Sequence, residues 1–185
     1  MSGSGTGTPI SEAVTFTVED GSGLSTANSY VSVADADTYH ATYTGSTDWS
    51  GAENATKERA LIAATQYLDI EHEGRWRGVK DSSTQSLAWP RCDAEDSDGY
   101  LIDSDALPQK LKDACCELAL RVVLGDDLLG VVTEPGDVAS ESVTVGPIST
   151  AVEYVNGRPD VGNSYPRVES LLKSLLQETG RVYRG

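Results

Sequence analysis

The chain has 185 residues, with 29 acidic and 14 basic side chains and a formal net charge of -15. A chain of this length can bury a substantial core without disulfides or metal ions. The acidic charge counts against duplex DNA as a ligand, because such binding depends mainly on neutralising phosphates. The three cysteines, Cys92, Cys115 and Cys116, form neither a disulfide framework nor a CxxC metal motif.

The first fifteen residues are rich in glycine, serine and threonine, and we expect a flexible N-terminal extension over residues 1–15. They lack the basic and apolar regions of a signal peptide. No segment approaches the roughly 20 apolar residues of a membrane span, so we expect a soluble protein with no membrane partner. Phe16 and Val18 alternate with polar residues, which predicts a short strand or extended arm.

Two capping boxes predict the first helices. Ser32 and Asp35 have the spacing of a capping box in its acidic variant, which predicts a short helix. One side of it would carry Ala36, Tyr39, His40 and Tyr43. Ser50 and Glu53 form a full capping box, which predicts that a long helix opens there and stops at Gly74. Its apolar positions would be Leu61, Ala64 or Thr65, and Leu68.

Two prolines predict the later helices, because proline is favoured at the first helical position. Pro108 would begin a helix that ends at Gly125. Its apolar stripe would be Leu111, Cys115, Leu118 and Val122. Pro166 would begin a last helix that ends at Gly180. Its inward positions would be Val168, Leu171, Leu172 and Leu175.

Between these last two helices, at about residues 138–157, the sequence predicts a β-hairpin or a pair of extended arms. The apolar positions there are Val143 and Val145, then Val152 and Tyr154, with Ile148 out of phase. Gly-Pro separates the two runs. The predicted fold is mainly α, a small bundle of about four helices with an inserted β-hairpin or extended arms. One domain would cover residues 16–180, followed by a short tail at 181–185.

No catalytic or metal site is indicated. The acidic loop after Cys92 fits a calcium-binding loop poorly, because Ala94 falls at the first ligand position and Asp105 at the twelfth. The only histidines, His40 and His72, have no partner at zinc-ligand spacing. We expect His72, between two glutamates, at the surface with a raised pKa. No nucleophile elbow or phosphate-binding loop occurs, so we predict no enzyme, no cofactor and no metal ion.

The stretch RWRGVKDSSTQSLAWPR, residues 75–91, concentrates aromatic and basic side chains in this acidic chain. Such interleaving is typical of grooves for single-stranded nucleic acid, and also of loops that lock onto a core. We favour a structural clamp and leave subunit contact and base stacking as alternatives. The clamp would consist of Trp76, Trp89 and Pro90, with Arg75, Arg77 and Arg91 along the rings or paired with acidic residues.

Several segments occur in an order that carries a resemblance: TVEDGSGLSTANSYVSVADADTYH, RWRG, QSLAWPR, DGYLID and LPQKLKDACCELAL. Over roughly residues 16–124 they resemble the head–tail connector adaptors of tailed phages, a family of neck proteins. Some members are described as DnaT-like single-stranded DNA-binding proteins. The most specific portion is LAWPR followed by DG-x-LID, and VGPISTAVEY and SYPRVESLLKSLL match more weakly.

The resemblance implies a homo-oligomeric ring, commonly a dodecamer, in the virion neck at the head–tail junction. The protein would be made in the cytoplasm of the host bacterium. Its partners would be the portal protein, the next tail component (a stopper, nozzle or tail tube) and further copies of itself. Genomic DNA would pass through the channel during ejection without sequence-specific binding, and an acidic wall would favour that passage.

The resemblance also implies where contacts occur, because the C-terminal segment of such adaptors commonly reaches the portal. We therefore expect portal or subunit contacts at Arg167, Arg181, Tyr183 and Arg184. An inserted hairpin can also add strands to the edge of a neighbour, so we expect further contacts at Val143, Val145, Ile148, Val152 and Tyr154. The main alternative is a single-stranded DNA-binding protein that uses Trp76, Trp89 and the arginines near them. A small hydrolase or a calcium-binding module is the third possibility.

Overall fold

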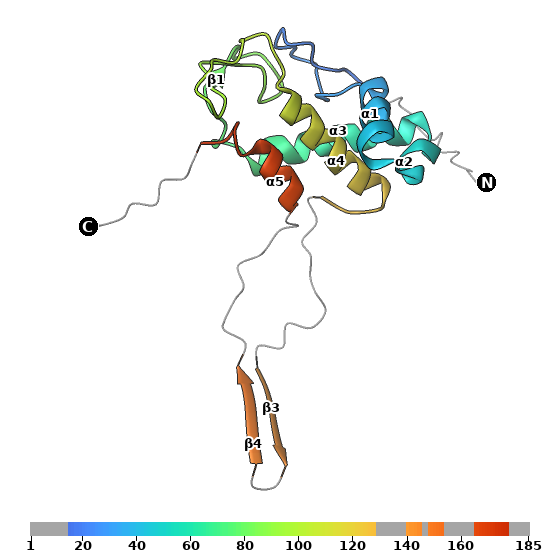
Figure 1. Ribbon diagram of the computed structural model, residues 1–185, viewed down its shortest axis with the longest axis vertical. Coiled ribbons are helices and arrows are strands. Elements are labelled where there is room, and N and C mark those ends of the chain that lie inside the picture. The colour runs from blue at the N-terminus through green and yellow to red at the C-terminus, as the bar shows by residue number, and fades with distance from the viewer. Residues whose placement is uncertain (1–14, 129–139, 146–147, 154–164, 178–185) are drawn as a thin grey trace, which may run out of the picture.

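The computed structural model describes residues 15–128, 140–145, 148–153 and 165–177 (Figure 1). The described helices are α1 (Val33–Tyr39), the π-helical turn η1 (His40–Thr44), α2 (Thr47–Gly51), α3 (Asn54–Glu71), α4 (Gln109–Val123) and α5 (Pro166–Leu172). The strands are β1 (Val79–Lys80), β2 (Arg91–Cys92), β3 (Ser140–Val145) and β4 (Ile148–Glu153). The prediction of a mainly helical bundle with an inserted hairpin is confirmed.

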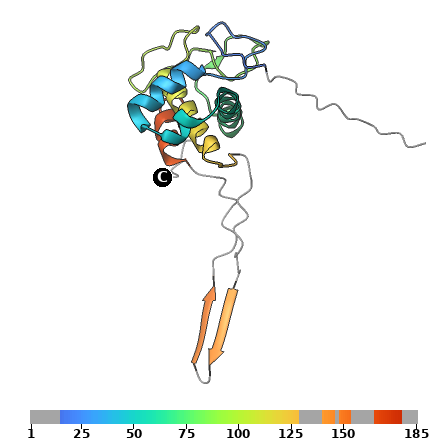
Figure 2. The same ribbon diagram turned by 90° about the vertical axis from the view of Figure 1, so that its right-hand side faces the viewer.

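The core lies between α3 and α4, with α5 packed on α4 and α1 at the other end (Figures 1 and 2). Leu61 and Leu68 of α3 are fully buried, as are Leu111 and Leu118 of α4. Thr65 belongs to the same layer, where its hydroxyl lies 3.4 Å from a cysteine sulfur of α4. The apolar positions predicted for the long helix are therefore confirmed. None of the described helices is both long and apolar enough to cross a membrane.

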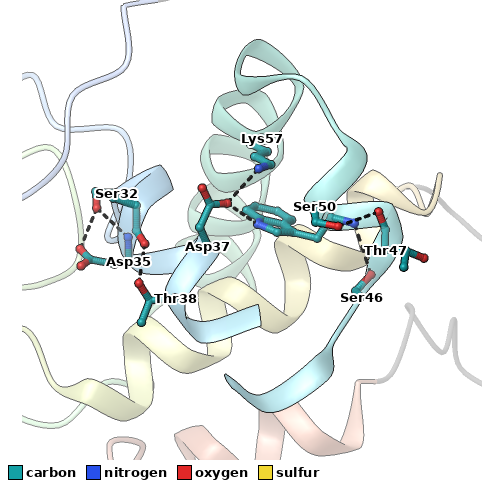
Figure 3. Close-up of polar contacts among 10 residues, drawn as sticks. Ser32, Asp35, Asp37, Thr38, Ser46, Thr47, Ser50 and Lys57 are labelled. Carbon is teal, nitrogen blue, oxygen red and sulfur yellow. Dashed lines mark hydrogen bonds and ion pairs between the residues drawn. The ribbon is translucent and has the colours of Figure 1, made fainter. Parts of the chain in front are cut away.

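The helix predicted after Ser32 is present, and its N-terminus is capped as expected. The Ser32 hydroxyl accepts a hydrogen bond from the backbone N–H of Asp35 at 3.1 Å (Figure 3). The helix then widens into η1, where the Gly45 N–H donates to the carbonyl of His40. The Tyr43 ring lies 5.0 Å from that of Tyr39, on the same side as predicted, but Tyr43 itself is 66% exposed. The wider π turn changes the angular spacing of the residues and rotates Tyr43 away from the core.

The second predicted capping box is wrong, because Ser50 lies inside a separate short helix. This helix, α2, is capped by Ser46, whose hydroxyl accepts from the N–H of Trp49 at 3.3 Å. Trp49 is 1% exposed. The long helix α3 begins afterwards at Asn54, with Glu53 as an N-cap whose side chain makes no capping bond. Burial of the Trp49 ring accounts for the extra helix, which the local capping pattern does not reveal.

The last helix is shorter than predicted, because α5 ends at Leu172 instead of continuing to Gly180. The chain after it turns back against the segment that follows α3. Leu176 forms an antiparallel bridge with Trp76, and the N–H of Gln177 donates to the carbonyl of Arg75 at 2.7 Å. These long-range backbone bonds favour an extended conformation where the local sequence favours helix.

The predicted extended arm near the N-terminus contributes one isolated bridge, between Val18 and Ser29. The following turn is fixed by Glu19, which is 2% exposed. Its carboxylate accepts hydrogen bonds from three backbone N–H groups, those of Gly21, Gly23 and Leu24. At Gly21, where φ is +101°, an added Cβ would lie 1.9 Å from a backbone oxygen of the chain before α4. Only glycine fits this close approach.

The predicted hairpin is confirmed as β3 paired with β4 in an antiparallel sheet of two strands. The register pairs Val143 with Thr150, Val145 with Ile148, and Val152 with Glu141. Directly opposed residues share a face of an antiparallel ladder, so the valine and isoleucine positions fall on one face, together with Glu141 and Thr150. These positions are Val143, Val145, Ile148 and Val152, whereas Ala151, opposite Ser142, lies on the other face. The expectation that Ile148 is out of phase is therefore wrong, and Tyr154 lies outside the described residues.

Candidate functional site

The two tryptophans of the 75–91 stretch are buried in the helical bundle. Trp89 is 0% exposed and Trp76 is 3% exposed. Their ring centroids lie 6.2 Å apart in an edge-to-face arrangement. Trp76 makes a second edge contact with His72, at 5.4 Å. Base stacking needs an open ring face, so neither tryptophan can stack on a nucleotide in this structure.

A buried hydrogen-bond network holds the chain on either side of Trp89. The Tyr30 hydroxyl donates to the Asp69 carboxylate at 2.5 Å and accepts from the N–H groups of Ala88 and Trp89. The Ala88 N–H is shared with the second Asp69 oxygen, at 2.9 Å. Burial raises the pKa of Tyr30 well above its usual value, and Asp69 adds to the effect, so the hydroxyl stays protonated. Pro90 follows through a cis peptide bond.

Arg77 and Arg91 bind backbone carbonyls rather than acidic side chains or rings, which corrects the sequence-based expectation, whereas Arg75 lies 3.3 Å from the His72 ring nitrogen Nδ1. Arg91 donates to the carbonyls of Arg77, Gly78 and Ala88, at 2.7, 2.7 and 3.0 Å. Arg77 donates to the carbonyl of Leu176 at 3.1 Å. Every residue has a backbone carbonyl, so the sequence composition could not identify these hydrogen-bond acceptors. With their donors used inside the fold, Arg77 and Arg91 are poor candidates for phosphate contacts.

His72 is fully buried, so its predicted surface position and raised pKa are both wrong. Its pKa is lowered to about 4, first because burial penalises the charged ring and then because Arg75 lies beside it. The carboxylate of Glu169 in α5 lies 3.6 Å from His72 Nε2, but it is partly exposed and does not outweigh the burial. The neighbouring glutamates, Glu71 and Glu73, face solvent. His72 is therefore neutral near pH 7.

A second polar cluster, which the sequence did not suggest, joins α1, α2 and α3. Asp37 accepts hydrogen bonds from Lys57 Nζ at 2.9 Å and from Trp49 Nε1 at 2.8 Å (Figure 3). Lys57 is 6% exposed, and its ammonium lies 5.6 Å from the centre of the Trp49 ring. Partial burial opposes ionisation of Asp37, but the bonds from Lys57 and Trp49 outweigh it and lower its pKa. The cluster ties α2 to the bundle.

The acidic loop after Cys92, which fits a calcium-binding loop poorly by sequence, forms a polar turn around Asp96. Asp96 uses one carboxylate oxygen to accept from the N–H groups of Asp98 and Tyr100, at 2.9 and 3.0 Å. These backbone bonds lower its pKa. Among the residues that the structure describes, no group of three or more histidine, cysteine or acidic side chains could hold a metal ion.

Among the residues that the structure describes, the most exposed aromatic side chains are Tyr100 and Tyr43. Tyr100, in the acidic turn, is 73% exposed, and Leu101 beside it is 68% exposed. Tyr43 in η1 is 66% exposed and lies beside Tyr39, with ring centroids 5.0 Å apart. A groove of about 350 Å³ next to this pair is lined by side chains from α1, η1 and the first half of α4.

Of the residues expected to contact a portal or another subunit, Arg167 is described in full. Its side chain is 62% exposed, and its guanidinium lies 3.0 Å from the Glu117 carboxylate. Glu117 also accepts a bond of 2.6 Å from the Tyr39 hydroxyl, so one carboxylate links α5, α4 and α1. The hairpin positions lie on the face defined above. Arg181, Tyr183 and Arg184 fall outside the described residues.

These features define a small helical protein with an inserted hairpin, in which the tryptophans are part of the core. A family described as "Putative DnaT-like ssDNA binding protein" matches residues 14–185, and the chain belongs to that family. Its description names single-stranded DNA and makes no mention of a virion or a portal. Neither the curated proteins nor the solved structures include a match to this chain.

Proposed function

We propose that the protein is a structural adaptor of a phage neck. Copies would form a ring, of twelve subunits by resemblance to connector adaptors, that joins the portal vertex to the next tail component. The ring would let genomic DNA pass and would do no chemistry. The sequence segments that resemble connector adaptors suggest this role, and the inserted hairpin is the structural observation that carries it.

The hairpin supports self-association because its valine and isoleucine residues share one face. Among the described strands, β3 and β4 pair only with each other. A two-stranded ribbon is at best marginally stable alone, and an apolar face gains stability when another surface covers it. Both outer edges of the ribbon also offer unpaired backbone groups to a neighbouring chain. A second copy of the chain would supply both kinds of contact around a ring.

The net charge of -15 also supports a DNA conduit over a DNA-binding protein. A channel through which DNA passes should repel phosphates, and an acidic wall does so. The two tryptophans and the arginines beside them, the strongest sequence signal for nucleic-acid binding, are engaged within the fold. They stabilise the subunit and leave little for a nucleotide to contact.

Single-stranded DNA binding is the second candidate, because the family description names it. It would need a surface other than Trp76 and Trp89, and within the described ranges the rings of Tyr43 and Tyr100 are the most exposed. Fluorescence anisotropy with a labelled oligothymidine at low and high salt tests it. Tight, salt-sensitive binding that Tyr43→Ala or Tyr100→Ala abolishes without unfolding the protein would favour this candidate over the adaptor.

Co-assembly with the portal protein of the same phage tests the adaptor directly. The full chain is mixed with purified portal rings, sedimented through a gradient and imaged by electron microscopy. The proposal predicts a second ring stacked on the portal. A chain that sediments apart from portal rings at all concentrations, and is also missing from virions, would overturn it. Arg167→Glu should weaken the stacking, whereas Arg59→Glu, on the exposed face of α3, serves as a charge-matched control.

A further inference from the structure

The groove beside Tyr43 has the features of a binding site for a cationic segment. Its lining residues include two tyrosines, Tyr39 and Tyr43, two aspartates, Asp35 and Asp113, and Lys112. Within the described part of the chain, neither carboxylate forms an ion pair. Asp35 bonds to a serine hydroxyl and Asp113 to a glutamine amide, so both can still attract a cation.

The tyrosine pair gives this groove an apolar and aromatic wall. The two rings are tilted at 44° with centroids 5.0 Å apart, and Tyr43 leaves two thirds of its surface in solvent. An exposed ring beside carboxylates is well suited to an arginine, whose planar guanidinium stacks on aromatic faces and binds carboxylates through two parallel hydrogen bonds. Aromatic and arginine side chains also dominate the binding energy of protein interfaces.

This chain contains a segment with the complementary chemistry. The residues after Gln177 read ETGRVYRG, with Arg181 and Arg184 flanking Tyr183. The segment therefore carries one cation before and one after an aromatic residue. In charge and in aromatic character it is complementary to two carboxylates beside a pair of tyrosines. Elsewhere, arginines Arg77 and Arg91 are bound to backbone carbonyls and are not available for such a contact.

A neighbouring copy is the better source of this segment than the same copy. The described chain ends at Gln177, which is bonded to Arg75 and Trp76 on the β1 side of the body, across from α1 (Figure 1). Six residues reach at most about 20 Å, so Tyr183 of the same copy would have to cross the body fully extended. The segment of an adjacent subunit has no such constraint.

We propose that the segment 178–185 of one copy binds in the groove of a second copy, with Arg181 and Arg184 on Asp35 and Asp113 and Tyr183 against Tyr43. Such a head-to-tail contact repeats around a ring and closes it without a two-fold axis. The pairing rests on the self-association proposed above and adds a second contact between subunits to the one that the hairpin makes. Screening by salt should weaken the contact, because it would depend on pairs of opposite charge at the subunit surface.

Photo-crosslinking in the full chain tests the pairing. Tyr183 is replaced by the photoreactive amino acid p-benzoylphenylalanine, and isotopically light and heavy proteins are mixed before irradiation. Mass spectrometry should find cross-links between light and heavy copies, on Tyr39, Tyr43 or Lys112. Asp113→Arg should remove these cross-links, and adding Arg184→Glu on the partner copy should restore them. The same photoreactive group at Tyr100, an exposed site far along the sequence, should give no cross-link to the groove.

The outcomes separate this inference from the function on which it rests. Rings that form without a cross-link from position 183 to the groove overturn the pairing and leave the adaptor intact. Cross-links confined to a single copy overturn the pairing between subunits. A protein that stays monomeric under all conditions overturns the pairing together with self-association.

Discussion

The hydroxyl of Tyr30 lies 2.5 Å from the carboxylate of Asp69, and this contact joins the chain before α1 to the end of α3. The same hydroxyl accepts from the N–H of Trp89, so three distant segments meet at one oxygen. The contact fixes the backbone that carries Trp89 into the core. This contact therefore explains why residues 75–91, with their two tryptophans, form part of the core.

Removing the Tyr30 hydroxyl should destabilise the subunit without changing its fold. In Tyr30→Phe the ring stays buried, but one Asp69 oxygen and the Trp89 N–H lose their partner. Leaving buried polar groups unpaired costs about 1–3 kcal/mol, so urea denaturation should show a loss of that size. Tyr100→Phe, at an exposed tyrosine, is the matched control and should leave the free energy of unfolding unchanged. Equal stability of both variants would contradict the structural role of the contact.

Truncating Trp89 should cost more than any loss of a single hydrogen bond. The ring is 0% exposed, and Trp89→Ala would leave a large cavity beside Trp76. Such truncations cost about 3–5 kcal/mol, which chemical denaturation measures. The rival explanation, base stacking, instead predicts a stable protein that has lost its affinity for oligonucleotides. A soluble Trp89→Ala protein with wild-type stability would count against the packing role.

His72 should make the subunit less stable in mild acid. Its pKa is about 4 in the folded protein, whereas an unfolded histidine titrates near 6.5, so the unfolded chain binds the proton more readily between these values. The stabilisation is complete above about pH 6.5 and is lost as the pH falls toward 4. The free energy of unfolding of His72→Gln should depend less on pH in this window than that of the wild type. An unchanged slope would show that His72 is not buried in its neutral form. His40, whose pKa burial also lowers, stays in both proteins and cancels in the comparison.

The hairpin register supplies a matched pair of substitutions for self-association. Val143 lies on the apolar face and its neighbour Ser142 on the opposite one. Val143→Asp should therefore prevent or weaken oligomer formation, because it places a charge on the covered face, while Ser142→Asp should not. Sedimentation velocity measures both, and thermal melting should show that neither change unfolds the helices. An equal effect of the two substitutions would remove the hairpin face from the interface.

The sequence predicted those parts of the fold that local patterns specify. The Ser32 cap, the buried stripe of α3 and the hairpin with its central break depend on residues within a few positions of one another. The errors lie where tertiary contacts override local signals. Trp49 is buried by a separate short helix, α2, that local patterns did not predict. Leu176 was predicted to be helical but forms a β-bridge with Trp76.

The candidate site shows the same division between local and long-range information. Trp76 and Trp89 could be recognised as a pair from their spacing and the flanking proline, but their acceptors and neighbours could not. Three helices contribute the cluster of Asp37, Trp49 and Lys57. No spacing in the sequence predicts this cluster. The exposure of His72 was predicted wrongly because its neighbours in the sequence are acidic. Its neighbours in space are the Trp76 ring and Glu169 of α5.

The central claim, that this chain builds the ring beneath a portal, is tested most directly by imaging the neck of virions that carry a tagged copy of the protein. Cryo-electron microscopy of the head–tail junction should show a ring of this fold directly below the portal, with the β3–β4 hairpins between adjacent subunits. Virions that lack the protein at the junction, together with tight salt-sensitive binding of the purified chain to single-stranded DNA, would contradict the account.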